Sequence, residues 1–104
     1  MSYFAPFSPI GSNVSVTTLA GASTGATALP SDAAGNVIMV YNSGASPAFM
    51  KLGGAGVAAA AASDIPIPPN SMMPFSIDPA TQTHFTIFSA TAGMVVYVMR
   101  GGGT

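Results

Sequence analysis

Two short motifs in this chain could carry chemistry, and the first is typical of serine hydrolases. The pentapeptide GASTG, centred on Ser23, matches the G-x-S-x-G pattern, and Asp64 or Asp78 followed by His84 completes the order Ser, Asp, His. A nucleophilic serine of this kind needs a buried strand before it and a helix after it. Here a stretch of small residues follows and ends at Pro30. We therefore expect residues 20–36 to form a small-residue loop or a weak strand with no catalytic role.

The second motif is the hexapeptide GAGVAA, residues 54–59, which matches the G-x-G-x-x-A pattern of dinucleotide-binding proteins. Asp78 follows at a suitable spacing. The pattern binds a pyrophosphate only at the start of a helix, and Pro66, Pro68 and Pro69 leave little room for one. We expect a glycine-rich turn between strands and no cofactor.

Metal binding has little support in the sequence. His84 is the only histidine, there is no cysteine, and Asp32, Asp64 and Asp78 show no spacing that would bring them together. One imidazole and scattered carboxylates do not make a ligand set. The sequence thus predicts no catalytic, cofactor-binding or metal-binding residues.

Charged residues are unusually rare. Lys and Arg together number 2 and Asp and Glu together 3, which is 5% of the chain against about 25% in typical soluble domains. Two basic residues cannot form a surface for nucleic acid. The net charge of −1 supplies little repulsion between copies, and mean hydropathy is positive. We infer that partner proteins normally cover much of the surface.

Neither a membrane span nor a secretory signal is expected. The longest purely apolar stretches, 57–62 and 94–99, are far shorter than the roughly 18 residues that a transmembrane helix needs. The first twelve residues contain no Lys or Arg and are interrupted by Pro6 and Pro9. We expect a protein that begins near Met1 and is made in a cytosol.

Alternating apolar segments bounded by turn residues predict an all-β fold. We expect a single small antiparallel β-sandwich or barrel, jelly-roll-like, over residues 14–104, preceded by an extended N-terminal arm over residues 1–13. The predicted strands are 14–19, 37–41, 48–52, 71–77, 84–89 and 94–100.

The pattern also indicates how some strands are placed. Strands 37–41 and 48–52 are expected to form a hairpin across the turn 42–47, and strand 37–41 to be covered on both faces. Strand 94–100, which is apolar on both faces until Arg100, is expected at the centre of its sheet. The proline-rich residues 64–71 are expected to form a stiffened approach to strand 71–77. Pro74 favours an edge position for 71–77. Between the strands, the alanine run 57–63 is expected to be extended or a short helix.

The candidate interface residues are aromatic or flexible. In the arm they are Tyr3, Phe4 and Phe7, whose neighbours Pro6 and Pro9 are expected to prevent both helix and strand pairing. We expect this arm to reach a neighbouring chain in an assembly. Met72 is expected on the polar side of its strand and is the fourth candidate. The methionines expected in the core are Met39, Met50, Met73 and Met94.

The order of elements resembles a group of known proteins. The segments NVIMVYNSGASPAFMKLG, DIPIPPNSMMPFSI and THFTIFSATAGMVVYVMRGGG together resemble small structural proteins of tailed bacteriophages and prophages over residues 36–103. The resemblance implies a capsid decoration protein, a cement protein or a connector component.

Composition and resemblance favour a non-enzymatic virion structural protein, most specifically a capsid decoration or cement protein present in many copies. Its partners would be capsid or other virion proteins and further copies of itself, as a trimer or larger oligomer. A head–tail connector or tail component is the alternative within this class. A carbohydrate-binding β-module that stacks sugars on Tyr41, Tyr97 and Phe88 is a second class, and a small hydrolase using Ser23 is a third.

Overall fold

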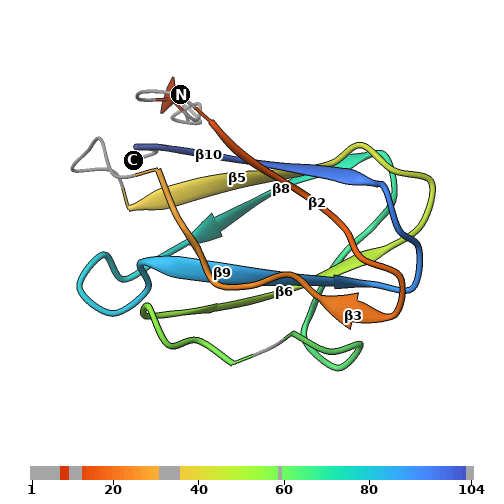
Figure 1. Ribbon diagram of the computed structural model, residues 1–104. Helices are drawn as coiled ribbons and strands as arrows, with labels where there is room; N and C mark the ends of the chain where they lie inside the picture. Colours follow the sequence, from red (N-terminus) through yellow and green to blue (C-terminus); the bar gives the residue numbers. More distant parts are fainter. Residues whose placement is uncertain (1–7, 10–12, 31–35, 59, 103–104) are drawn as a thin grey trace.

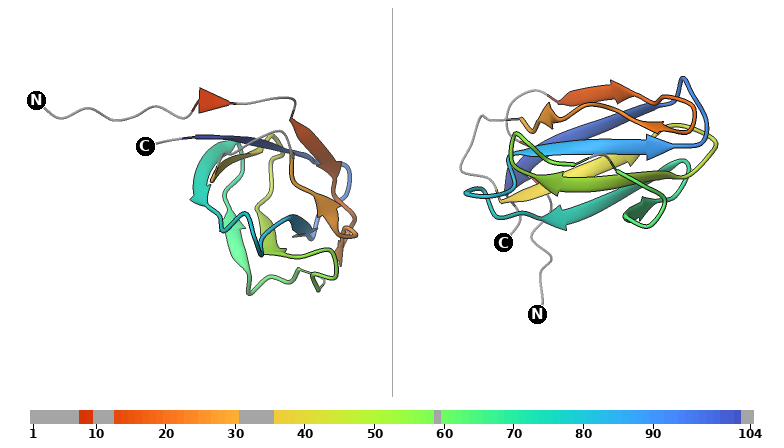
Figure 2. Two further views of the ribbon diagram at one scale, coloured as in Figure 1. Left: turned by 90° about the vertical axis from the view of Figure 1, so that its left-hand side faces the viewer. Right: turned by 60° about the horizontal axis from the view of Figure 1, so that its bottom comes forward.

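The computed structural model describes residues 8–9, 13–30, 36–58 and 60–102, and all regular structure in these residues is β. Two antiparallel sheets, called sheet A and sheet B, pack face to face (Figure 1). The views in Figure 2 show the two layers from other sides. The prediction of a small all-β sandwich is confirmed. The described residues include no helix of the length and hydrophobicity that crossing a bilayer would require.

Sheet A has its longest strand, β10, at the centre. β10 pairs with β5 on one side, and on the other side with β2 and β1; β8 pairs with the far side of β5. The bounds are β1 Ser8–Pro9, β2 Val14–Thr17, β5 Val37–Asn42, β8 Ser71–Ser76 and β10 Val95–Gly102. The central position predicted for 94–100 and the edge position predicted for 71–77 are both confirmed.

Sheet B has β9 between β6 on one side and the short strands β3 and β4 on the other, with β7 at the far edge beside β6. The bounds are β3 Ala22–Ser23, β4 Thr27–Ala28, β6 Ala48–Gly53, β7 Ile65–Ile67 and β9 His84–Ser89. With β3 and β4 taken as one interrupted strand, β2-β10-β5-β8 faces β3/β4-β9-β6-β7. This is the two-sheet order of a jelly roll.

The predicted hairpin between 37–41 and 48–52 is wrong. β5 belongs to sheet A and β6 to sheet B, and the connection between them crosses from one layer to the other (Figure 1). Asn42 holds this crossing: its side-chain Nδ2 donates to the carbonyl of Ser46 at 2.9 Å and to that of Ile67, in β7, at 3.2 Å. Its Oδ1 accepts the amide N–H of Gly44 at 2.9 Å. The turn residues therefore make a corner between sheets.

Two further expectations need correction at the ends of the chain and in the proline-rich segment. Ser8 and Pro9 pair with Gly102 and Gly101, so Pro9 does join a ladder. Proline is tolerated there because β1 is an edge strand. Residues 65–67, expected to belong to a proline-stiffened approach to the next strand, form β7 at the edge of sheet B.

The core lies between the sheets and is built from the inward residues of each strand. The largest buried apolar side chains are Phe85, Ile38, Met50, Ile67, Ile87, Val40, Val96 and Val98. Met50 and Met94 are buried as predicted, and Met73 packs half-buried on the inward side of β8. Met39 does not belong to the core: it alternates with the buried Ile38 and Val40 and therefore faces outward.

Candidate interaction surface on the outer face of sheet A

The outward residues of sheet A form an apolar area on β5, β10 and most of β8, whereas the outward residues Ser15 and Thr17 on β2 and Ser76 on β8 are polar. Antiparallel pairing places Tyr97 beside Tyr41 and Tyr41 beside Met72. In the next row, Met99 lies beside Met39 and Met39 beside Pro74. Directly paired residues share a face of the sheet. We call this surface the outer apolar face; it consists of Val37, Met39, Tyr41, Met72, Pro74, Val95, Tyr97 and Met99.

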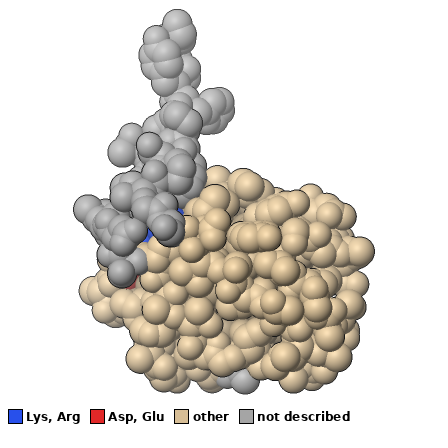
Figure 3. Space-filling model, turned by 45° about the horizontal axis from the view of Figure 1, so that its top comes forward, with Lys and Arg blue, Asp and Glu red and all other residues tan. Residues whose placement is uncertain are grey.

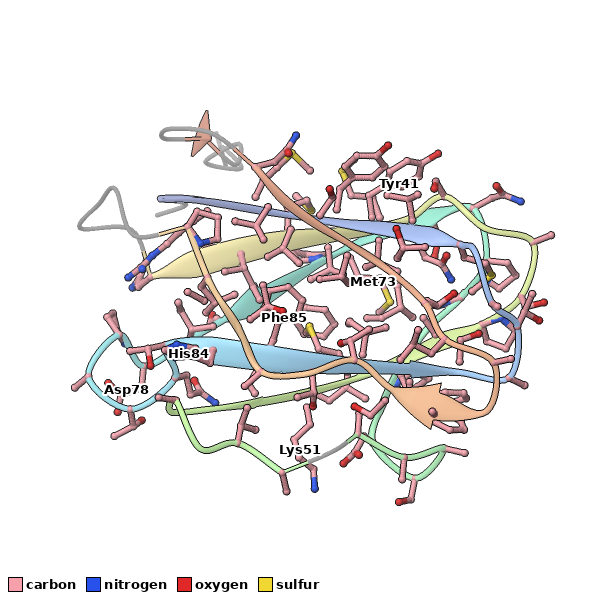
Figure 4. All side chains as sticks on the ribbon, in the orientation of Figure 1. Tyr41, Lys51, Met73, Asp78, His84 and Phe85 are labelled. Carbon is pink, nitrogen blue, oxygen red and sulfur yellow. The ribbon has the colours of Figure 1, made fainter. Side chains whose placement is uncertain are left out.

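These residues are accessible. Met72 is 52% exposed, Pro74 is exposed, and the other six are half-buried. Tyr41 and Tyr97 stack with their ring centroids 6.0 Å apart and an angle of 19° between the rings. Figure 4 shows Tyr41 pointing away from sheet B, whereas Met73 and Phe85 lie between the layers. Met72 is therefore exposed, but the side of β8 on which it lies, expected to be polar, is part of the outer apolar face.

The outer apolar face carries no charge. Of the charged residues that the structure describes, Arg100 points inward and donates to the carbonyl of Pro30 at 2.9 Å, and Asp78 lies between β8 and β9. Lys51 and Asp64 pair on the side of sheet B. Asp32 lies outside the described residues. The view in Figure 3 shows blue and red atoms only in small spots near the grey atoms.

Sheet B differs because the chain covers part of its outer face itself. The segment after β6, residues 57–58 and 60–64, runs beneath that sheet (Figure 1). Thr86 donates from Oγ1 to the carbonyl of Ala58 at 3.0 Å, and the amide of Ala60 donates to Ser23 Oγ at 3.0 Å. Small alanine side chains let this backbone approach the sheet closely. The described residues of the alanine run thus cover part of the outer face of sheet B without forming regular secondary structure, and they do not cover sheet A.

Ser23 and His84 are not brought together. Ser23 pairs with Phe88 on β9, whereas His84 begins the same strand four residues earlier and pairs with Ala28. At about 3.4 Å per residue this spacing is roughly 14 Å. Ser23 Oγ donates to the carbonyl of Thr24 and accepts from Ala60, while His84 Nδ1 lies 2.8 Å from Thr83 Oγ1. Both side chains have structural partners.

The two aspartates proposed for the same triad are held in turns of their own. Asp64 Oδ2 accepts the amide of Ala61 at 2.7 Å, and Asp78 Oδ1 accepts the amide of Ala80 at 3.0 Å. The hexapeptide at 54–59 begins with a turn closed by the amide of Val57 donating to the carbonyl of Gly54 at 3.0 Å. The sequence therefore contains both motifs, but the structure does not give their residues the geometry that the chemistry requires.

We expect Ser23→Ala to lower the free energy of unfolding by about 1 kcal/mol, because the amide of Ala60 loses a neutral hydrogen-bond acceptor. Urea denaturation of wild-type and variant protein measures the difference. His84→Ala, which removes only the contact with Thr83, is the comparison and should cost no more. A hydrolytic activity that is lost in folded Ser23→Ala protein would contradict this structural role.

The remaining candidate residues divide between the two sheets or lie outside the described part. Tyr41 and Tyr97 share the outer apolar face, but Phe88 lies on sheet B, where its ring is 6.2 Å from that of Phe49. The three residues considered for sugar stacking therefore form no single platform. Tyr3, Phe4 and Phe7 lie outside the described residues.

No pocket is found on the part of the chain that the structure describes, and no three His, Asp or Glu side chains there lie close enough to hold a metal ion. The sequence reasoning missed the role of Met39, Met99, Tyr41 and Tyr97 as one surface. The sequence did contain a signal for this surface. All outward residues of β5, and those of β10 up to Met99, are apolar.

No protein-family model matches this sequence, and the comparisons with curated proteins and with solved structures gave no match.

Proposed function

We propose that this chain is a non-enzymatic structural protein of a tailed-bacteriophage virion, made in the host cytoplasm, and acts as a capsid decoration or cement protein in many copies. The observation that carries the proposal is the outer apolar face: an uncharged, accessible surface on the central strands of a protein that has a net charge of only −1. A surface of this kind is typical of a protein that functions with a partner in place.

Energetics support an assembled state over a dispersed one. Each square ångström of apolar surface removed from water contributes about 25 cal/mol, and the outer apolar face requires no charge to be desolvated. A subunit with so little net charge also meets little repulsion when many copies gather on one shell. Dense display of identical subunits is therefore favourable for this surface.

The fold is compatible with the proposal, and the sequence resemblance favours it. Jelly rolls occur in viral capsid domains, and they also occur in lectins and cupins. Because one fold hosts many functions, the architecture alone does not select among them. The resemblance of residues 36–103 to small phage structural proteins favours the virion, and connector or tail positions would use the same face.

A carbohydrate-binding module is the second candidate, and the stacked pair Tyr41 and Tyr97 favours it specifically. Two neighbouring aromatic rings on an exposed sheet can stack against a sugar. Sugar recognition also needs polar groups that fix the hydroxyls. On the described face only the tyrosine hydroxyls and the flanking Ser15, Thr17 and Ser76 could supply them.

Quantitative mass spectrometry of purified phage particles from the strain that carries this gene tests the proposal. We expect the protein at a copy number comparable to that of the major capsid protein. A copy number that corresponds to a single ring of subunits in each particle would place the protein at a connector or in the tail instead. Its absence from particles, together with saturable binding to an oligosaccharide, would contradict the proposal and favour the carbohydrate-binding module.

A further inference from the structure

The N-terminal segment and the outer apolar face match in chemistry, length and direction. Resting on the proposed function, we propose that the outer apolar face of one copy binds residues 1–7 of a second copy. Each copy then donates one segment and accepts another. Such a head-to-tail contact closes into a ring when the rotation between neighbours allows it, which accommodates the trimer or larger oligomer expected from the sequence.

The chemistry of the two surfaces is complementary. Residues 1–7 carry no charged side chain and include Tyr3, Phe4 and Phe7. The face presents three methionines, Met39, Met72 and Met99, whose flexible thioethers adapt to aromatic rings and make favourable sulfur–aromatic contacts. A charged or strongly polar occupant would find no ion-pairing partner among the described residues of this face.

The length of the segment is sufficient. Ser8 pairs with Gly102 and Pro9 with Gly101, and Gly101 lies beside Val37 at one end of the face. Seven extended residues reach at most about 24 Å. The face runs from Val37 to Tyr41, which is roughly 14 Å along the strand. A segment of this length can cross the face of an adjacent copy with residues to spare.

The direction of β1 favours a second copy as the acceptor. β1 is antiparallel to β10, so a chain that continues backwards from Ser8 in the same direction passes beyond Gly102 and leaves sheet A. Binding to its own face would require a reversal immediately before Ser8. Binding to the face of a neighbour placed beyond that end requires none.

The areas also favour exchange of the segment over stacking of two bare faces. The three strands that carry the outer apolar face, taken over about six residues each, present about 300 Å². Two bare faces stacked on each other would therefore bury about 600 Å² in total, well below the roughly 1,600 Å² of a standard interface. Three aromatic side chains add roughly 450–750 Å². Each contact between a face and a segment therefore buries about 750–1050 Å² in total, more than bare stacking, and every copy in a ring makes two such contacts.

Analytical ultracentrifugation of three purified proteins tests the exchange. We expect the full chain to form a trimer or larger ring, and both the deletion of residues 2–7 and the double variant Met39→Thr with Met99→Thr to be monomeric. The deletion keeps β1, and threonine keeps a strand-forming residue at each site. Leu19→Thr, which removes another exposed apolar side chain (50% exposed) away from the face, should assemble like the wild type.

Mixing the two monomeric variants gives the decisive result. The deletion variant still has a face and the double variant still has a segment, so together they should form a one-to-one complex that grows no further. A monomeric full chain, a deletion variant that assembles as well as the full chain, or a mixture that stays monomeric while both components melt cooperatively would overturn the inference.

A synthetic peptide of residues 1–7 locates the site independently of folding defects in the variants. Titrated into the deletion protein labelled with ¹³C-methyl methionine, it should shift the signals of Met39, Met72 and Met99 and leave those of Met50, Met73 and Met94 unchanged. Unchanged outer methyl signals at saturating peptide would contradict the proposal. Particle occupancy is scored separately: a protein found on particles whose segment does not bind the face would retain the proposed function and lose this inference.

Discussion

Val96→Asp should abolish cooperative folding at room temperature. Val96 is fully buried at the centre of sheet A, between Asn42 of β5 and Val16 of β2, and its side chain contributes to the core. An unpaired carboxylate there costs about 3–5 kcal/mol or more, against a total stability of about 5–15 kcal/mol for a domain. Circular dichroism and urea denaturation measure the loss.

Val95→Asp is the matched control, because it places the same carboxylate one residue earlier on the half-buried outer side of the strand. Both substitutions are made in the monomeric variant that lacks residues 2–7, in which the outer apolar face is uncovered. The cost of Val95→Asp there should be about 1 kcal/mol, since water reaches the charge. If the Val96→Asp protein unfolded cooperatively near the midpoint of that parent variant, β10 would not be the central strand.

The second large effect is expected for Asn42→Asp, although the two side chains have nearly the same shape. The Asn42 side chain is fully buried, and its amide nitrogen donates to the carbonyls of Ser46 and Ile67. A carboxylate cannot donate and would face both carbonyl oxygens as a buried negative charge. We expect a loss of about 3–5 kcal/mol in the free energy of unfolding at neutral pH.

Asn36→Asp makes the same chemical change at an exposed asparagine just before β5 and should alter stability by about 0.5 kcal/mol or less. Equal effects of the two substitutions, measured by urea denaturation, would show that the corner between β5 and β6 does not depend on the Asn42 hydrogen bonds.

The positions of the long strands could be predicted from the sequence because each one ends at residues that favour turns. The strand predicted over 84–89 matches β9, and those over 37–41 and 48–52 differ from β5 and β6 by one residue. The short strands β1 and β7 were not predicted as strands, and the segment that holds β3 and β4 was predicted only as a loop or a weak strand, because ladders of two or three residues depend on pairing with a neighbouring strand more than on local preference.

Strand pairing was not predictable from local patterns in the same way. A short turn between two apolar strands usually indicates a hairpin, yet among the described strands only β6 and β7 are both consecutive along the chain and paired with each other. The crossing from β5 to β6 depends on Asn42 reaching Ile67, which is 25 residues away in the sequence. A contact between residues so far apart has no local signature.

The candidate surface was partly predictable. Met72 was expected to face outward beside Pro74, and it does. Met39 was assigned to the core because its strand is apolar on both faces. The same pattern is expected for a strand that buries one face between the two sheets and leaves the other face available to a partner protein. Sequence alone does not separate these two situations, and the alternation of burial along β5 does.

Methionine oxidation tests the central claim, that the outer apolar face is covered in the assembly. Dilute peroxide is applied to the monomeric variant that lacks residues 2–7, as the free subunit, and to purified particles, and mass spectrometry follows each methionine. We predict that Met39, Met72 and Met99 oxidise at least tenfold more slowly in particles, while the buried Met50 and Met94 stay slow in both samples. Equal oxidation rates of Met72 in particles and in the free subunit would contradict the claim.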